Sequence, residues 1–147
     1  KGDFVRNDYV AYFKGYAGHQ SRLAILGPPS DEQQKGYALT LDIHRRTIER
    51  CTAGITAGEV YQFVVDKFKK KNIDYPASLV GHSMGAWFHQ QEPVLRRGSE
   101  TVLEDGMILA IEPQRLHWHI QDLIVIENGK THLLSDKFPI DQPFIIN

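Results

Sequence analysis

The sequence has only one cysteine and lacks any long apolar run. No stretch approaches the ~20 consecutive apolar residues that a membrane-spanning helix requires, and the first residues show no signal-peptide pattern. The single thiol, that of Cys51, cannot form a disulfide within the chain, and such sparse cysteine usage is typical of proteins from reducing compartments. We therefore expect a cytoplasmic protein that does not act on a membrane.

An excess of charge of either sign is also absent. The 17 Lys and Arg residues nearly balance the 18 Asp and Glu residues, which leaves a net charge of -1. Broad electrostatic attraction to nucleic acid or to an anionic membrane is therefore not expected. The one dense basic cluster, Lys67 to Lys71, is predicted to be the solvated end of a helix, where cations interact favourably with the helix dipole.

What the chain does have is enough apolar material for one core. It contains 147 residues, of which 41% are hydrophobic and 24% are charged, and this size suits a single domain. The first residues, KGDFVRNDYV, enter a strand-like run at once and without an initiator Met. We therefore expect residues 1–147 to be one partial catalytic domain, the C-terminal part of something longer.

Turn residues and capping patterns predict strands on either side of two helices. The runs FVRNDYVAYF and SRLAIL, separated by KGYAG, predict a hairpin. Ser30 with Gln33, and Thr56 with Glu59, are capping-box pairs that open helices.

From residue 79 onward the runs SLVGHSMG, GMILAIEP, DLIVIENG and THLLS predict short strands, with a hairpin turn at ENG. The whole pattern predicts an α+β domain with the helices gathered on one face of a curved antiparallel sheet.

Side chains that bind metals or transfer protons recur at the strand-like positions. They are Asp8, His19, His82, His89, Glu112, His117, His119 and Gln121. Imidazole and carboxylate groups together bind Zn, Mn, Fe or Co, and they also perform acid–base chemistry unaided. His117 and His119 would share one face of a strand, either as a two-histidine metal pair or as the ordinary alternation of a surface strand. His44, on an apolar helical stripe, is predicted to be a partly buried structural residue.

The order of these motifs resembles the C-terminal half of the pita-bread hydrolases. GHSMGAWFHQQEP precedes ETVLEDGMILAIEP and IQDLIVIENG, and GDFVRNDYVAYFKGYAGHQSRLAILGPPSDEQ lies upstream of them. This family comprises Xaa-Pro aminopeptidases, prolidases (Xaa-Pro dipeptidases), methionine aminopeptidases and creatinase. The resemblance implies the pita-bread fold, a small-molecule or dipeptide substrate and, for the full-length protein, a homodimer.

The resemblance also implies a set of five metal-binding positions. Peptidases of this family hold two divalent metals with two Asp, one His and two Glu, and the matching positions here are Asp8, His19, His82, Glu112 and Gln121. Thus His19 and Gln121 stand where the family has the carboxylates that bridge the two metals. Because neither an imidazole nor a neutral amide readily bridges metals, a standard dinuclear centre is not expected.

Two kinds of site remain open. A single divalent ion could be held by His82, Glu112 and His19, with Gln121 as a weak oxygen ligand or a hydrogen-bond donor. Alternatively no metal binds and His82 shuttles a proton, as the equivalent histidine does in creatinase-like enzymes, which the GHS element resembles. In both cases His89 matches the family's second histidine, a donor to the developing tetrahedral centre.

Three functions are compatible with this pattern. The retained framework of Asp8, His82, His89 and Glu112 favours a hydrolase that resembles Xaa-Pro peptidases or creatinase, has a degenerate metal site and cleaves a C–N bond in a small amino-acid-like or dipeptide substrate. In this hypothesis His82, His89 and Glu112 are the catalytic residues. The loss of both bridging carboxylates favours, instead, a non-catalytic module that binds peptides or proteins. The third possibility is a lyase, since the fold also hosts elimination chemistry.

Overall fold

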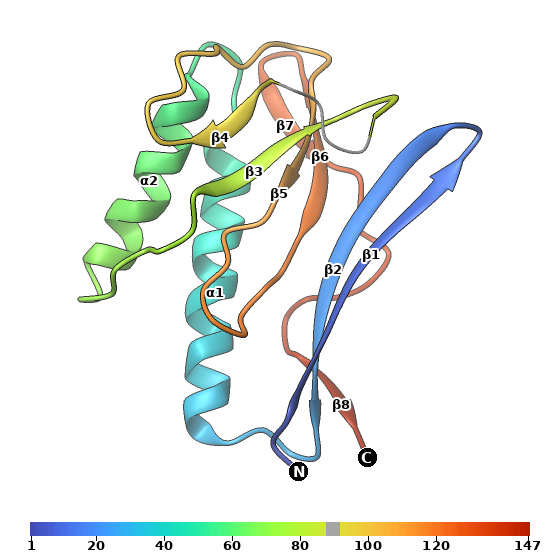
Figure 1. Cartoon of the computed structure of the whole chain (residues 1–147), viewed down its shortest axis with the longest axis vertical. Coiled ribbons are helices and arrows are strands. Elements are labelled where there is room, and N and C mark those ends of the chain that lie inside the picture. Colours follow the sequence, from blue (N-terminus) through green and yellow to red (C-terminus); the bar gives the residue numbers. More distant parts are fainter. Residues whose placement is uncertain (88–91) are drawn as a thin grey trace.

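The computed structural model describes residues 1–87 and 92–147, which form two helices and two β-sheets. In chain order the elements are β1 (Phe4–Phe13), β2 (Tyr16–Leu26), α1 (Asp31–Arg50), α2 (Ala57–Lys69), β3 (Leu79–Met84), β4 (Val94–Arg96), β5 (Ile108–Ile111), β6 (Asp122–Glu127), β7 (Lys130–Leu133) and β8 (Phe144–Ile146). In Figure 1 the two helices, the five-stranded sheet and the β1–β2 hairpin follow one another across the view. The α+β class predicted from the sequence is confirmed.

The smaller sheet, of order β1-β2-β8, is dominated by a long hairpin. Strands β1 and β2 pair from Phe4 opposite Ile25 to Phe13 opposite Tyr16. Lys14 and Gly15 form the turn with φ of 50° and 88°, and two positive φ angles match the twist of the flanking strands. The predicted five-residue turn was therefore too long, because residues 16–18 already belong to β2.

Both helices begin where the capping boxes place them. Ser30 accepts a hydrogen bond from the backbone of Gln33, whose side chain accepts one from the backbone of Ser30, and Thr56 and Glu59 repeat the pattern for α2. These exchanges satisfy backbone donors that would otherwise be unpaired in the first turn. Helix α2 ends within the lysine cluster, as predicted.

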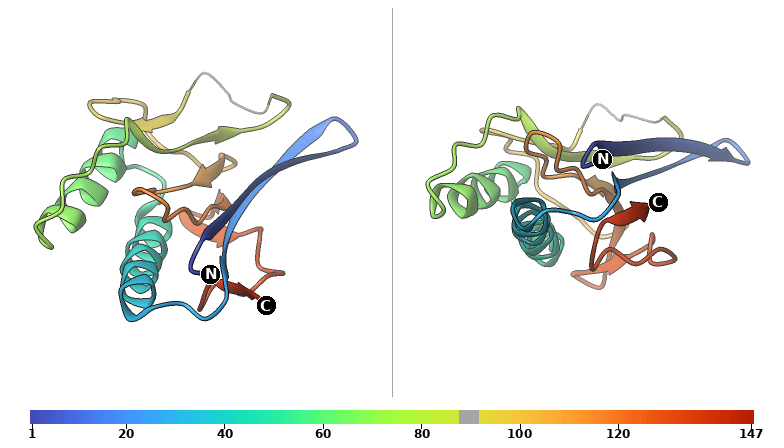
Figure 2. Two further views of the ribbon diagram at one scale, coloured as in Figure 1. Left: turned by 60° about the horizontal axis from the view of Figure 1, so that its bottom comes forward. Right: turned by 90° about the horizontal axis from the view of Figure 1, so that it is seen from below.

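The larger sheet has the order β4-β3-β5-β6-β7, and all its pairings are antiparallel. Both helices pack against one side of it (Figure 2). Val64, Phe68, Leu95, Leu109 and Ile124 are fully buried in the core between them. Asn128 and Gly129, with φ of 53° and 73°, form the hairpin turn between β6 and β7 that the ENG motif predicts.

An isolated backbone bridge between Ser21 and Gln121 links β2 to the start of β6. The amide of Ser21 in β2 donates to the carbonyl of Gln121 over 3.3 Å, and the amide of Gln121 donates to the carbonyl of Ser21 over 3.2 Å. This bridge brings β1 and β2 close to the start of β6, so that residues far apart in sequence face each other. Within the part of the chain that the structure describes, no helix is long and apolar enough to cross a membrane.

Candidate functional site

The predicted polar residues gather where the two sheets meet. Asp8 and His19 come from the hairpin, where their strands pair directly. His82 lies on β3, Glu112 directly follows β5, and Gln121 directly precedes β6. All but Asp8 are buried. Five positions spread over more than 100 residues of sequence thus form one site.

His19 uses both ring nitrogens in contacts with its neighbours. Its Nε2 lies 2.9 Å from Asp8 Oδ1, and its Nδ1 lies 2.6 Å from Gln121 Nε2. A carboxylate only accepts and an amide nitrogen only donates, so a neutral His19 carries its hydrogen on Nε2 and accepts at Nδ1. The amide oxygen of Gln121 is buried and has no hydrogen-bond partner among the described residues. His19 and Gln121 therefore bind each other.

Asp8 carries the site's most solvent-accessible carboxylate. Its side chain is 34% exposed, and Oδ2 accepts a hydrogen bond of 2.8 Å from Arg6. Partial burial raises the pKa of Asp8, but the hydrogen bonds from Arg6 and His19 and the nearby charge of His119 outweigh burial, so the pKa lies below its ordinary value. Asp8 is therefore ionised at neutral pH.

His82 is buried with one ring nitrogen fixed by the backbone. Its Nδ1 lies 3.1 Å from the carbonyl oxygen of Ser83, and because a carbonyl only accepts, Nδ1 carries a hydrogen. Nε2 lies 3.7 Å from Glu112 Oε1, and the ring centroid is 5.6 Å from that of His19. A neutral His82 therefore has its lone pair on Nε2, the nitrogen nearest Glu112.

His119, a candidate by residue type but not by the family motifs, also lies among these residues. Its ring is fully buried, with Nε2 3.2 Å from Glu112 Oε2 and Nδ1 3.2 Å from Ser21 Oγ. His117 is exposed and stacks on Phe4 instead. Both interpretations of the two histidines were wrong, since residues 115–118 form a turn and not a strand.

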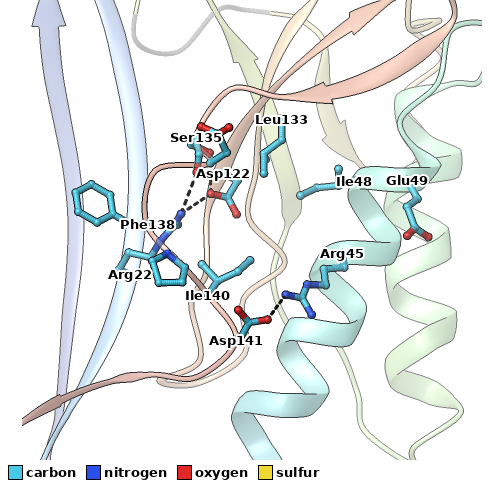
Figure 3. A pocket seen from close by; sticks show the side chains of 12 residues that line it. Arg22, Arg45, Ile48, Glu49, Asp122, Leu133, Ser135, Phe138, Ile140 and Asp141 are labelled. Atoms are coloured by element: carbon cyan, nitrogen blue, oxygen red, sulfur yellow. Dashed lines mark hydrogen bonds and ion pairs between the residues drawn. The ribbon is translucent and has the colours of Figure 1, made fainter.

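A second polar network lies on the other side of β6, around Asp122 (Figure 3). Asp122 accepts hydrogen bonds from Arg22, His44 and Ser135 over 2.7–2.8 Å. Burial raises the pKa of Asp122, but the hydrogen bonds from His44 and Ser135 and the charges of His44 and Arg22 hold it below its ordinary value. His44 is fully buried, more deeply than predicted. Arg22 also donates to the carbonyls of Ser21 and Gln121, so this network fixes the bridge beneath the site.

Comparisons with known proteins agree with this architecture. The sequence model of metallopeptidase family M24 matches residues 1–130. The chain belongs to metallopeptidase family M24. It is 31% identical over 140 residues to an Xaa-Pro dipeptidase from Pyrococcus furiosus, covering 90% of this chain and 40% of that protein. It is 35% identical over 112 residues to an Xaa-Pro dipeptidase from Lactobacillus helveticus, covering 76% and 30%.

Solved structures of M24 relatives confirm the pita-bread fold. A prolidase from Thermococcus sibiricus superimposes with a TM-score of 0.86 and 29% identity, over 99% of this chain and 40% of that one. An X-Pro aminopeptidase from Thermotoga maritima, at 21% identity, shares the fold with a TM-score of 0.89, over 99% of this chain and 42% of that one. The chain thus spans 30% to 42% of the length of these relatives.

The donor atoms present do not match the two-metal centre that the M24 resemblance implies. Among residues 1–87 and 92–147 no group of three or more His, Cys, Asp or Glu side chains is arranged to hold a metal ion. His19 directs both nitrogens to protein partners, and the nitrogen of Gln121 faces His19. Of the five expected ligands, Asp8, His82 and Glu112 keep donor atoms suited to a divalent ion. His89 lies outside the described residues.

Proposed function

We propose that this chain carries catalytic residues of a hydrolase that cleaves a C–N bond in a dipeptide or a small amino-acid-like substrate, without a metal pair. The fixed ring of His82 is the observation that carries the proposal. Its Nδ1 hydrogen is held by the Ser83 carbonyl, and its Nε2 lies 3.7 Å from Glu112 Oε1, which places this second nitrogen where it can act as a base. Membership of M24 and similarity to Xaa-Pro dipeptidases support the substrate class.

Hydrolysis requires a proton to leave the attacking water and a proton to reach the departing nitrogen. In the proposed reaction His82 Nε2 accepts the water proton as the water oxygen bonds to the substrate carbon. The same proton passes to the nitrogen as the C–N bond breaks, which returns His82 to its neutral form and releases an acid and an amine. Glu112 Oε1, 3.7 Å from Nε2, stabilises the transient imidazolium.

The degenerate metal site supports proton transfer by protein groups. In a two-metal centre, carboxylates offset the charge of the ions, and here the two bridging positions hold a neutral amide and an imidazole that bind each other. With only Asp8 and Glu112 left, two divalent ions would lack both bridging ligands and half of the compensating charge. No proposed step therefore passes through a metal. The buried amide oxygen of Gln121 offers an acceptor for a substrate N–H group.

The assay that tests this proposal uses the complete protein and a panel of Xaa-Pro dipeptides and N-acyl amino acids. We expect turnover to survive dialysis against a chelator, and His82→Ala to lower kcat by about 100-fold or more, the usual contribution of a positioned acid–base group. His132→Ala, which removes an exposed imidazole on β7, is the matched control and should leave kcat unchanged. Full turnover by His82→Ala would contradict the assigned role.

The same assay separates the hydrolase from the binding module and the lyase. The replacement of both bridging carboxylates is the observation that favours a binding module, and saturable dipeptide binding without turnover would support it. An unsaturated product formed without uptake of water would identify a lyase.

We further propose, from the family resemblance and the sparse cysteine usage, that the full-length protein is a cytoplasmic homodimer.

A further inference from the structure

Arg6 lies next to the candidate site, on the same strand as Asp8. The two residues are two positions apart on β1, and side chains at such positions point to the same face of a strand. Since Asp8 faces the site, Arg6 faces it too. A guanidinium does not lose its proton in proteins, so Arg6 brings a fixed positive charge to this place.

Two contacts hold the guanidinium of Arg6 between the two sides of the site. Nη2 donates to Asp8 Oδ2 over 2.8 Å, and Nη1 donates to Gln114 Oε1 over 3.3 Å. Gln114 lies two residues after Glu112, in the segment that joins β5 to β6. Arg6 therefore connects the strand that carries Asp8 with the segment that carries Glu112.

The guanidinium of Arg6 has donors left for a ligand. An arginine has five N–H donors, and the contacts with Asp8 and Gln114 use two of them. The Arg6 side chain is 41% exposed, whereas His82 and Glu112 are buried. A molecule in solution can therefore reach the remaining donors of Arg6 directly.

Arg22, the other arginine close to the site, is already committed to the fold. Its side chain is 11% exposed, and its terminal nitrogens donate to Asp122 and to backbone carbonyls. Apart from Arg6, no arginine or lysine in the described part of the chain forms an ion pair with Asp8 or Glu112. The fixed positive charge that an incoming anionic group meets at this site is therefore that of Arg6.

We propose that Arg6 determines substrate specificity by binding a carboxylate of the substrate. The planar donors of a guanidinium match the two oxygens of a carboxylate, and Asp8 and Gln114 hold those donors in place. This inference rests on the proposed function and names the substrates of that site. They carry a carboxylate next to the scissile C–N bond, either on the residue that supplies the nitrogen or on the acyl residue.

The fold does not require the ion pair of Arg6 with Asp8. Both side chains contact solvent, and such pairs contribute little to stability because water and salt screen them. We therefore expect Arg6→Gln to unfold at the same urea concentration as wild type. A change in specificity can then be measured on a folded variant.

Paired substrates test this role in the complete protein. One pair is an Xaa-Pro dipeptide and its C-terminal amide, and the other is aspartyl-proline amide and asparaginyl-proline amide. In at least one pair we expect wild type to favour the acid by about 10- to 100-fold in kcat/KM, the usual effect of a hydrogen bond to a charged group. Arg6→Gln should lose this preference. Arg6→Lys, which keeps the charge but not the planar donors, should keep part of it.

The ratio within a pair distinguishes recognition from a structural role. Arg46→Gln removes an exposed arginine that binds Asp42 on α1, and this matched control should leave both ratios unchanged. A purely structural Arg6 would affect the acid and the neutral substrate equally, so an Arg6→Gln protein with the wild-type ratios would overturn the proposal. A wild-type protein that does not discriminate in either pair would also overturn it.

The same comparison separates this inference from the proposed function. If His82→Ala keeps its turnover, the proposed catalysis fails, while the acid preference of wild type and Arg6→Gln still decides the role of Arg6. If the complete protein turns over no substrate, the ratios are measured as Kd values by calorimetry. If His82→Ala loses turnover and Arg6→Gln keeps the acid preference, the role of Arg6 fails on its own.

Discussion

At the scale of single residues, the candidate site is built from hydrogen-bonded pairs of side chains. His19 and Gln121, which the family resemblance would place at carboxylate positions, face each other at 2.6 Å, and His119 contacts Glu112. Family motifs predict His19, Glu112 and Gln121 as site positions. Residue type makes His119 a candidate, but the sequence does not predict its contact with Glu112, because the turn at residues 115–118 has no periodic signature. Leu116 has a φ of 54° in that turn, which residue type alone does not suggest.

We expect the buried carboxylate of Asp122 to contribute to the stability of the folded chain. Its carboxylate is buried and bound to Arg22 and His44. We expect Asp122→Asn to lower the free energy of unfolding in urea by about 3–5 kcal/mol, because it leaves a buried cation without its partner. Asp42→Asn, which removes an exposed ion pair with Arg46, is the matched control and should change stability little. An equal effect of the two substitutions would contradict the buried network.

The pH dependence of that effect follows from the pKa of Asp122. The folded-state pKa lies below the ordinary value of 3.8, so the ionised form is favoured by folding. The stabilisation is complete above pH 3.8 and is lost as the pH falls through the folded pKa. The difference in unfolding free energy between wild type and Asp122→Asn should therefore shrink as the pH falls below about 4. A difference that grows toward acid would contradict the lowered pKa.

At the scale of elements, the sequence predicts helix starts correctly where capping side chains mark the first turn. The capping boxes place both helix starts correctly, and the ENG turn places the β6–β7 hairpin. The short strands β4 and β8 were not predicted, because three residues carry too little periodicity. β8 pairs with the distant β2, and β4 pairs with β3 in an irregular register, so tertiary contacts decide their conformation.

The cap of α1 gives an element-scale prediction. Ser30→Ala removes the side chain that accepts from the backbone of Gln33, and we expect the free energy of unfolding to fall by about 1 kcal/mol. Ser78→Ala, at an exposed position outside both helices, serves as the control. Urea denaturation measures both variants, and no difference between them would contradict the cap.

At the scale of the whole molecule, the site forms where the hairpin sheet meets the larger sheet. Ser21 and Gln121 join the sheets, and Arg22 binds both carbonyls of that bridge. The sequence predicts the α+β class and the family, since motif order depends on the fold. It does not predict which atoms of the site bind each other, because the pairing of His19 with Gln121 and of His119 with Glu112 depends on how the sheets meet.

We propose that this site does not hold a metal pair, because His19 and Gln121 occupy positions that the family resemblance assigns to bridging carboxylates. Metal analysis of the purified complete protein tests it most directly, with wild type compared to the double variant His19→Asp and Gln121→Glu. We expect no stoichiometric divalent metal in wild type and a gain of bound metal in the double variant, which restores both bridging carboxylates. Two divalent ions per chain in the wild-type protein would contradict it.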